Sequence, residues 1–372
     1  MGSGLATLAP RRIAARLAEG LDRPLLAISA ALVLVGLVTL YSATHGTPVR
    51  LSAQLANLAV GATAMWIAAQ IPPQTLMRFA FPAYVGGLGL LLVVALFGEV
   101  VNGARRWLDL GFLRFQPSEL MKLALPLALA SYFHRREGTL RLRDFAAAAA
   151  IAALPVALVA RQPDLGTALL VAASGFTVLF FAGIGWKVLA GLGIAGLAAA
   201  PLAWGLLHDY QRRRILTLFD PTQDPLGAGY HTIQSTIAVG SGGIGGKGWL
   251  RGTQAHLDFI PERHTDFIFA VYAEEFGLVG SLALLALYTA LVVRGLMIAA
   301  KAATVFARLV SASLSLMFFT YAFVNIGMVA GILPVVGVPL PFVSYGGSAL
   351  ATLFVAIGIL MSAQRHRRLV QT

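Results

Sequence analysis

Long apolar stretches separated by short polar connections dominate this chain of 372 residues. A helix needs about 20 mainly apolar residues to cross the hydrocarbon core of a bilayer. Stretches of roughly that length lie at 24–43, 51–71, 76–97, 117–134, 145–162, 165–183, 187–207, 266–293, 309–332 and 348–364. The pattern therefore predicts an all-α polytopic membrane protein with about ten transmembrane helices.

Composition agrees with this fold class. Hydrophobic residues make up 58% of the chain and charged residues only 12%, against roughly 25% charged residues in soluble domains. The absence of cysteine excludes disulfides, a thiol nucleophile and a cysteine-built zinc site. The formal net charge of +12 comes from basic residues at the ends of apolar runs, as the charge bias of membrane-protein loops predicts. We therefore expect no nucleic-acid partner.

The basic residues also predict an orientation. Four arginines lie within residues 1–23, ahead of a first run that is too long for the apolar part of a signal peptide, and three more lie within 365–372. An even number of spans places both termini on one side, and arginine-rich ends favour the cytoplasm. Residues 1–23 and 365–372 are therefore predicted to be cytoplasmic, with the first span retained.

One connection is far longer than the others. It covers about 208–265, between the seventh and eighth spans, on the predicted outer side, and connections of this length are usually functional. No low-complexity linker and no second soluble domain is recognisable. We expect a single membrane domain over 1–372, with 208–265 as its large extracytoplasmic loop.

Three acids stand at the predicted starts of even-numbered spans: Glu119, Asp164 and Asp266. In the predicted topology all three spans begin on the outer side, so the three carboxylates are expected to meet in one outer cavity. Acids beside membrane helices are costly and mark functional sites by default. A first-turn acid is also a common helix cap, and Lys122 and Arg161 are each spaced to pair with one of the acids.

Asp266 has the strongest case for a chemical role. Glu262, Arg263 and His264 crowd several ionisable groups beside it. Its pKa depends on two opposed effects: a helix start lowers it, whereas desolvation and nearby acids raise it. Glu274 and Glu275 are secondary candidates, and since neighbouring helical positions point about 100° apart, at most one should face the same cavity.

The glycine-rich run at 240–248 allows two interpretations. Its G-x-G-x-x-G string lacks the strand and βαβ unit of a dinucleotide site. Successive amides in such a run can form an anion-binding nest, to which Lys247 and Arg251 would add positive charge. Alternatively, the glycines permit a tight turn packed against other helices.

Six motifs follow one another along nearly the whole chain, at Ala104–Gly111, Phe115–Lys122, Gln162–Thr167, Lys247–Gln254, Phe259–Phe269 and Pro339–Gly347. Together they resemble the SEDS family, the shape, elongation, division and sporulation membrane proteins. The Gly252-Thr-Gln254 run resembles the elongation branch, RodA, more than the division branch, FtsW.

This resemblance implies a peptidoglycan glycosyltransferase that polymerises lipid II into glycan strands for cell-wall elongation. It implies a multi-pass protein of the bacterial cytoplasmic (inner) membrane whose active site faces outward. Asp266 matches the essential acid of the family motif, while Glu119, Lys122 and Asp164 match its other polar positions. The implied partners are lipid II, the growing glycan strand, membrane lipid, a class B penicillin-binding protein and other membrane proteins of the elongation complex.

The chemistry of such a transfer is an inverting displacement, because the donor sugar is α-linked to a diphosphate and the product is β-linked. We expect Asp266 to be the general base, within a substrate-binding surface that includes Glu262 and His264. Candidates for stabilising the leaving diphosphate are Lys122, Arg212, Lys247 and Arg263. A divalent cation, Mg²⁺ or Mn²⁺, is an alternative whose ligands the sequence does not identify. The rival function is a lipid II flippase or other transporter, which often shows internal repeats that we do not find here.

Overall fold

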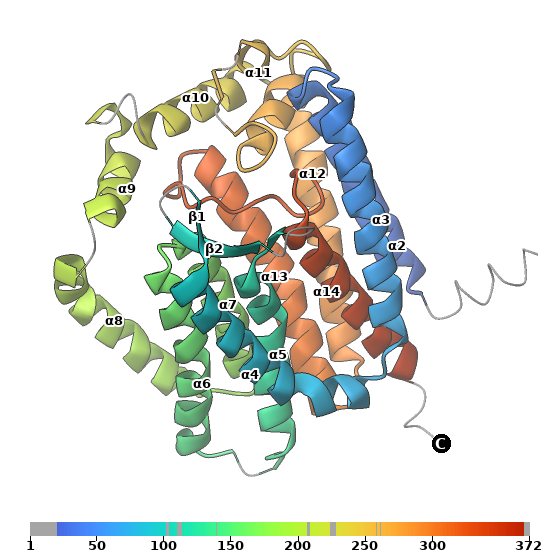
Figure 1. The fold of residues 1–372 in the computed structure, drawn as a ribbon, viewed down its shortest axis with the longest axis vertical. Coiled ribbons are helices and arrows are strands. Elements are labelled where there is room, and N and C mark those ends of the chain that lie inside the picture. Colours follow the sequence, from blue (N-terminus) through green and yellow to red (C-terminus); the bar gives the residue numbers. More distant parts are fainter. Residues whose placement is uncertain are drawn as a thin grey trace, which may run out of the picture.

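The computed structural model describes residues 21–101, 104–109, 114–138, 140–206, 209–223, 228–257, 259–260 and 262–367. Helices form the bulk of the molecule (Figure 1). The predicted apolar stretches correspond to α2 (Arg23–Ala43), α3 (Pro48–Gln70), α4 (Pro73–Phe97), α5 (Pro117–His134), α6 (Leu142–Arg161), α7 (Leu165–Phe181), α8 (Trp186–Leu206), α12 (Ile268–Ala300), α13 (Val305–Val329) and α14 (Ser348–Arg365).

Within the described residues, seven of these helices are long and apolar enough to cross a membrane by length and composition alone. The other three are α5, α7 and α8. Neighbouring helices cover α5: it packs against α4, α7 and α13, and nearly every residue from Pro117 to Phe133 is buried. A helix in the middle of a bundle can carry polar groups that a lipid-facing helix cannot. A crossing count of ten thus stays a prediction.

Close helix approach depends on small residues. At Gly358 of α14, an added Cβ would lie 2.4 Å from the Met65 carbonyl oxygen of α3, and at Gly61 of α3 it would lie 2.4 Å from the Phe354 ring. Small residues of this kind let membrane helices pack backbone to backbone. The α3 and α14 pair is correspondingly one of the main helix contacts of the fold.

Helix α12, which corresponds to the predicted eighth span, is interrupted by a backbone break that the apolar pattern did not predict. Gly277 has φ 63° and ψ −160°, so α12 consists of a short segment from Ile268 to Phe276 and a longer one after the break. A residue with positive φ is most readily a glycine. The amides of Leu278 and Val279 donate to the carbonyls of Gly243 and Ile244 at 2.9 and 3.1 Å. Asp266 therefore precedes a separate short helix. The long apolar segment starts about twelve residues after Asp266.

The long connection is mostly helical. It contains α9 (Asp209–Phe219), a 3₁₀ turn (Pro221–Gln223), α10 (Ala228–Ser241) and α11 (Thr253–His256), and Figure 1 shows it following the edge of the molecule from α8 to α11. A small antiparallel sheet that the sequence did not suggest joins α4 to α5. Its strands are β1 (Glu99–Val101), β2 (Ala104–Asp109) and β3 (Arg114–Phe115), in that order.

Some predicted features lie outside the described residues. They include most of the cytoplasmic N-terminus, all but the start of the C-terminus, residues 110 and 111 at the end of the Ala104–Gly111 motif, and Pro261 of the Phe259–Phe269 motif.

Candidate active site

Asp266 lies in the turn between α11 and α12, and its side chain is half-buried. The pKa of this carboxyl is raised to about 6, mainly by burial and then by the charges of Glu262 and Asp164, while Arg214 opposes these effects. Among the described residues, no donor is recorded for its carboxylate oxygens. Desolvation thus outweighs the helix start, and a carboxylate with this pKa is a competent base near neutral pH.

Asp164 caps α7 and also faces the site. Its side chain accepts hydrogen bonds from the Thr167 amide and from Gln116 Nε2, both at 3.1 Å. The prediction that Arg161 pairs with Asp164 is wrong. Arg161 ends α6 whereas Asp164 precedes α7, so the two do not share a helix. Arg106 of β2 lies 3.9 Å from the carboxylate instead.

Glu119 and Lys122 form the predicted pair. Lys122 Nζ lies 2.6 Å from Glu119 Oε1 and donates to the Tyr321 hydroxyl of α13 at 2.5 Å. All three side chains are buried, and Glu119 Oε2 has no recorded partner. Lys122 is therefore held inside the bundle by an acid and a phenol.

The three acids converge only in part. Asp164 is close enough to Asp266 to affect its pKa. Gln116, directly before α5, links Asp164 to the helix that carries Glu119. Glu119 itself is enclosed with Lys122, so the polar centre extends from a half-buried acid into the bundle.

The candidate cations occupy different places. Arg212 donates to the Trp204 and Gly205 carbonyls of α8 at 3.0 and 2.8 Å, whereas Arg214, two residues later, is the one whose charge reaches Asp266. Arg263 Nε donates to the Ala43 carbonyl at the end of α2, at 2.7 Å. Sequence alone did not distinguish Arg214, which acts on Asp266, from Arg212, which contacts α8.

Two histidines border the site. His264 Nδ1 lies 3.3 Å from Arg50 Nη1, and burial, then the nearby Arg50 charge, lowers the pKa of His264. His231 of α10 stacks on the Phe267 ring at 5.6 Å, next to Asp266, and burial lowers its pKa. Both rings are thereby favoured in the neutral form. Sequence reasoning missed His231, and only its aromatic neighbour in space identifies it. Glu262 is exposed and accepts from Thr265 Oγ1 at 3.1 Å.

The glycine run is a packing element. Several of its amides are engaged by carbonyls: those of Lys247 and Gly248 donate to the backbone carbonyls of Glu274 and Glu275 at 3.0 and 2.9 Å. An added Cβ at Gly246 would lie 2.1 Å from the Glu275 carbonyl oxygen. The tight-turn interpretation is confirmed, and the anion nest is wrong for these amides because their hydrogens are already used.

Lys247 belongs to the same packing. Its Nζ lies 2.6 Å from Glu274 Oε1 and 2.8 Å from Thr253 Oγ1. Glu274 also accepts from the Gln254 amide at 3.0 Å, while Glu275 accepts from Ser42 Oγ and from the Leu250 amide. Both glutamates therefore hold the 242–256 loop.

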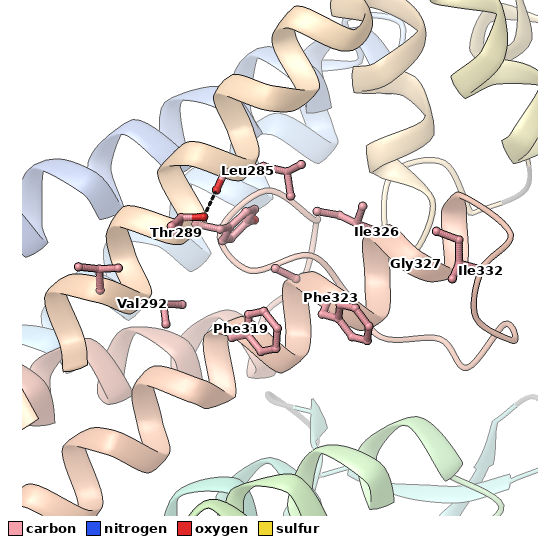
Figure 2. A pocket seen from close by; sticks show the side chains of 11 residues that line it. Leu285, Thr289, Val292, Phe319, Phe323, Ile326, Gly327 and Ile332 are labelled. Atoms are coloured by element: carbon pink, nitrogen blue, oxygen red, sulfur yellow. Dashed lines mark hydrogen bonds between the residues drawn. The ribbon is translucent and has the colours of Figure 1, made fainter.

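An apolar cavity of about 320 Å³ lies between α12 and α13, and Figure 2 shows Phe319, Phe323 and Ile326 along it. None of the described residues that line it carries a charge, and the Tyr288 hydroxyl there donates to the Pro341 carbonyl at 2.6 Å. This cavity offers no acid–base chemistry. Within the described part of the chain, no group of three or more His, Asp or Glu side chains is arranged to hold a metal ion.

Comparison with known proteins places this arrangement in a family. The family model for FtsW, RodA and SpoVE proteins, described as "Cell cycle protein", matches residues 23–369. Peptidoglycan glycosyltransferase MrdB of Escherichia coli is 50% identical over 351 residues, which cover 94% of this chain and 95% of that protein. A probable peptidoglycan glycosyltransferase FtsW of Geobacter metallireducens is 36% identical, covering 94% and 96%.

Solved structures agree with the sequence comparison. A chain from the work "Structural coordination of polymerization and crosslinking by a peptidoglycan synthase complex" superposes with a TM-score of 0.83 at 36% identity, covering 94% of this chain and 98% of that one. The crystal structure of Thermus thermophilus rod shape determining protein RodA gives 0.72 at 33% identity, with the same coverage.

Proposed function

The chain belongs to the FtsW, RodA and SpoVE family of peptidoglycan glycosyltransferases, and we propose that Asp266 is the general base with which it elongates glycan strands. The observation that carries the proposal is a half-buried carboxylate whose pKa is raised to about 6. Such a group is ionised at neutral pH and still basic enough to accept a hydroxyl proton.

The proposed substrate is lipid II. Asp266 takes the proton of the acceptor hydroxyl as that oxygen attacks the anomeric carbon of the α-linked donor. The bond to the diphosphate breaks on the opposite face, so the new linkage is β and the lipid diphosphate leaves with the electron pair. Arg214 and Arg50 are the cations that border Asp266 and His264, and we assign them to the leaving diphosphate together with Arg263.

We also propose that a divalent cation, Mg²⁺ or Mn²⁺, assists the transfer. Asp164 and Glu262 are each close enough to Asp266 to act on it electrostatically, yet the three acids do not form a complete ligand set among the described residues. Diphosphate oxygens would have to complete the coordination, and the cation would then stabilise the leaving group.

The setting follows from the hydrophobic helices and the family. The protein is a multi-pass protein of the inner membrane; we propose cytoplasmic termini and a site that faces outward, which puts Asp266 on the side where glycan strands are assembled. We further propose a class B penicillin-binding protein as its transpeptidase partner, supported by the likeness to a chain of a peptidoglycan synthase complex.

The test is polymerisation of purified lipid II by the protein with its cognate partner, comparing wild type with Asp266→Asn. We expect at least about a hundredfold loss of polymer, the scale of a positioned base. Glu137→Gln is the matched control because Glu137 is 59% exposed beyond the end of α5, and it should retain the wild-type rate. Omitting the partner tests the partner proposal in the same assay, which an equal rate would contradict.

Other outcomes redirect the proposal. Near-normal polymer from Asp266→Asn at matched folding and complex yield contradicts the assignment of the base and moves it to Asp164 or Glu119. An inactive wild type that moves lipid II across vesicles would favour the flippase instead.

A further inference from the structure

Asn325 of α13 joins two segments that enclose Asp266. Its side chain is fully buried. Its Nδ2 donates to the carbonyl oxygens of Asp266 and Val338, both at 2.7 Å. The first carbonyl belongs to the turn that carries the base, and the second to the loop between α13 and α14. A single carboxamide thus fixes the separation of these two segments.

The same loop, residues 336–345, holds the turn at successive positions. The Tyr345 amide donates to the His264 carbonyl at 2.9 Å, and Ser344 Oγ donates to the Thr265 carbonyl at 2.6 Å. With Asn325 on Asp266, three consecutive carbonyls of the turn are therefore occupied. These bonds fix the backbone from which the Asp266 side chain extends.

The loop also approaches the carboxylate. Gly337 has φ +71°, and an added Cβ there would lie 3.2 Å from Asp266 Oδ2. The bond from Asn325 to Val338, the next residue, sets how closely this glycine lies against the acid. The amide therefore influences both the direction of the carboxylate and its contact with water.

We propose that Asn325 is a positioning residue for the base Asp266: its two donors hold the catalytic turn against the 336–345 loop. The inference rests on the proposed function of Asp266. Loss of the donors would free the turn and leave two buried carbonyls unpaired, while the substrate-binding cations stay in place. Transfer would slow because reacting groups misplaced by about 1 Å lose about a hundredfold in rate.

A second consequence concerns pH. The charged groups acting on Asp266 are Glu262 in its own turn, Asp164 before α7 and Arg214 of α9, and burial is the largest cause of its raised pKa. None of these charges is altered by removing Asn325. Loosening the loop admits water, so the pKa of Asp266 should fall toward its ordinary value.

The experiment compares Asn325→Ala and Asn325→Asp with Ser313→Ala in lipid II polymerisation at several pH values. Asn325→Asp keeps the side-chain volume and removes the amide donors. Ser313 lies on the same helix, is fully buried and donates to the Ser174 carbonyl at 2.8 Å. It is twelve residues away, roughly 18 Å along the helix, so its variant loses one buried hydrogen bond remote from the base.

We expect both Asn325 variants to lower kcat by about 10- to 100-fold with KM changed less than about twofold. In Asn325→Ala the acid limb of the rate profile should also move to lower pH, whereas Ser313→Ala should keep the wild-type midpoint. A kcat within about threefold of wild type would overturn the inference. So would a lower rate for Asn325→Ala with an unchanged midpoint of the acid limb, because a smaller folded fraction would give that result. An active wild type with inactive Asp266→Asn keeps the proposed function standing in either case.

Discussion

Asp266 and the adjacent acids Glu274 and Glu275 lie close together in sequence but have different surroundings. Glu274 accepts hydrogen bonds from Lys247, Thr253 and the Gln254 amide, and Glu275 from Ser42 and the Leu250 amide. Asp266 is half-buried, has no recorded donor among the described residues, and has a raised pKa. Glu274 accepts donors on both carboxylate oxygens and holds structure, whereas the desolvated Asp266 is the acid that we propose for chemistry. The comparison teaches that hydrogen-bond donors distinguish the structural acid Glu274 from Asp266.

The largest expected effect is on stability. Glu274→Ala removes the acceptor for Lys247 Nζ and for the Gln254 backbone amide, leaving partly buried donors unpaired, and should cost about 2–4 kcal/mol of unfolding free energy. Thermal unfolding of the purified protein in detergent checks this. Glu137→Ala, which removes an exposed acid 3.5 Å from His134, should cost less than about 1 kcal/mol. Equal unfolding temperatures for the two variants would break the comparison.

The next effect is on rate. A base must be ionised, so the rate should fall as pH drops through the Asp266 pKa of about 6, and kcat at pH 5 should be about tenfold below its plateau. Initial rates of lipid II polymerisation between pH 5 and 8 measure this. A flat profile over that range would remove Asp266 from the rate-determining proton transfer.

The smallest expected effect is a gain in thermal stability. The folded-state pKa of Asp266 is above its ordinary value of 3.8, so the stability linked to its protonated form is present at low pH and lost as pH rises through about 6. At pH 8 the ionised acid therefore destabilises the fold, and Asp266→Asn should raise Tm by about 2 °C. The gain should shrink toward pH 5. A lower Tm for Asp266→Asn at pH 8 would place Asp266 with the structural acids.

Much of the site was predictable because local patterns identify it. The crowding of Glu262, Arg263 and His264 around Asp266 indicated an unusual acid, and the spacing of Glu119 and Lys122 predicted their pair. The partner of Asp164 was not predictable, since Arg106 comes from a small sheet far away in the chain. The hydrogen bond from Asn325 to the Asp266 carbonyl joins residues 59 positions apart. The spacing of residues along the chain cannot predict such a contact.

The sequence by itself determined where the apolar helices lie and which family the chain belongs to, and it singled out the acid that we propose for chemistry, because hydrophobic length and short motifs are local properties. Tertiary structure decided the break at Gly277, the internal use of Lys247 and the direction of the Asp266 pKa. The glycine break depends on acceptors supplied by the 242–256 loop, and a pKa depends on burial and on charges brought together from separate helices. Folding brings these acceptors and charges together, so they cannot be identified from the order of residues along the chain.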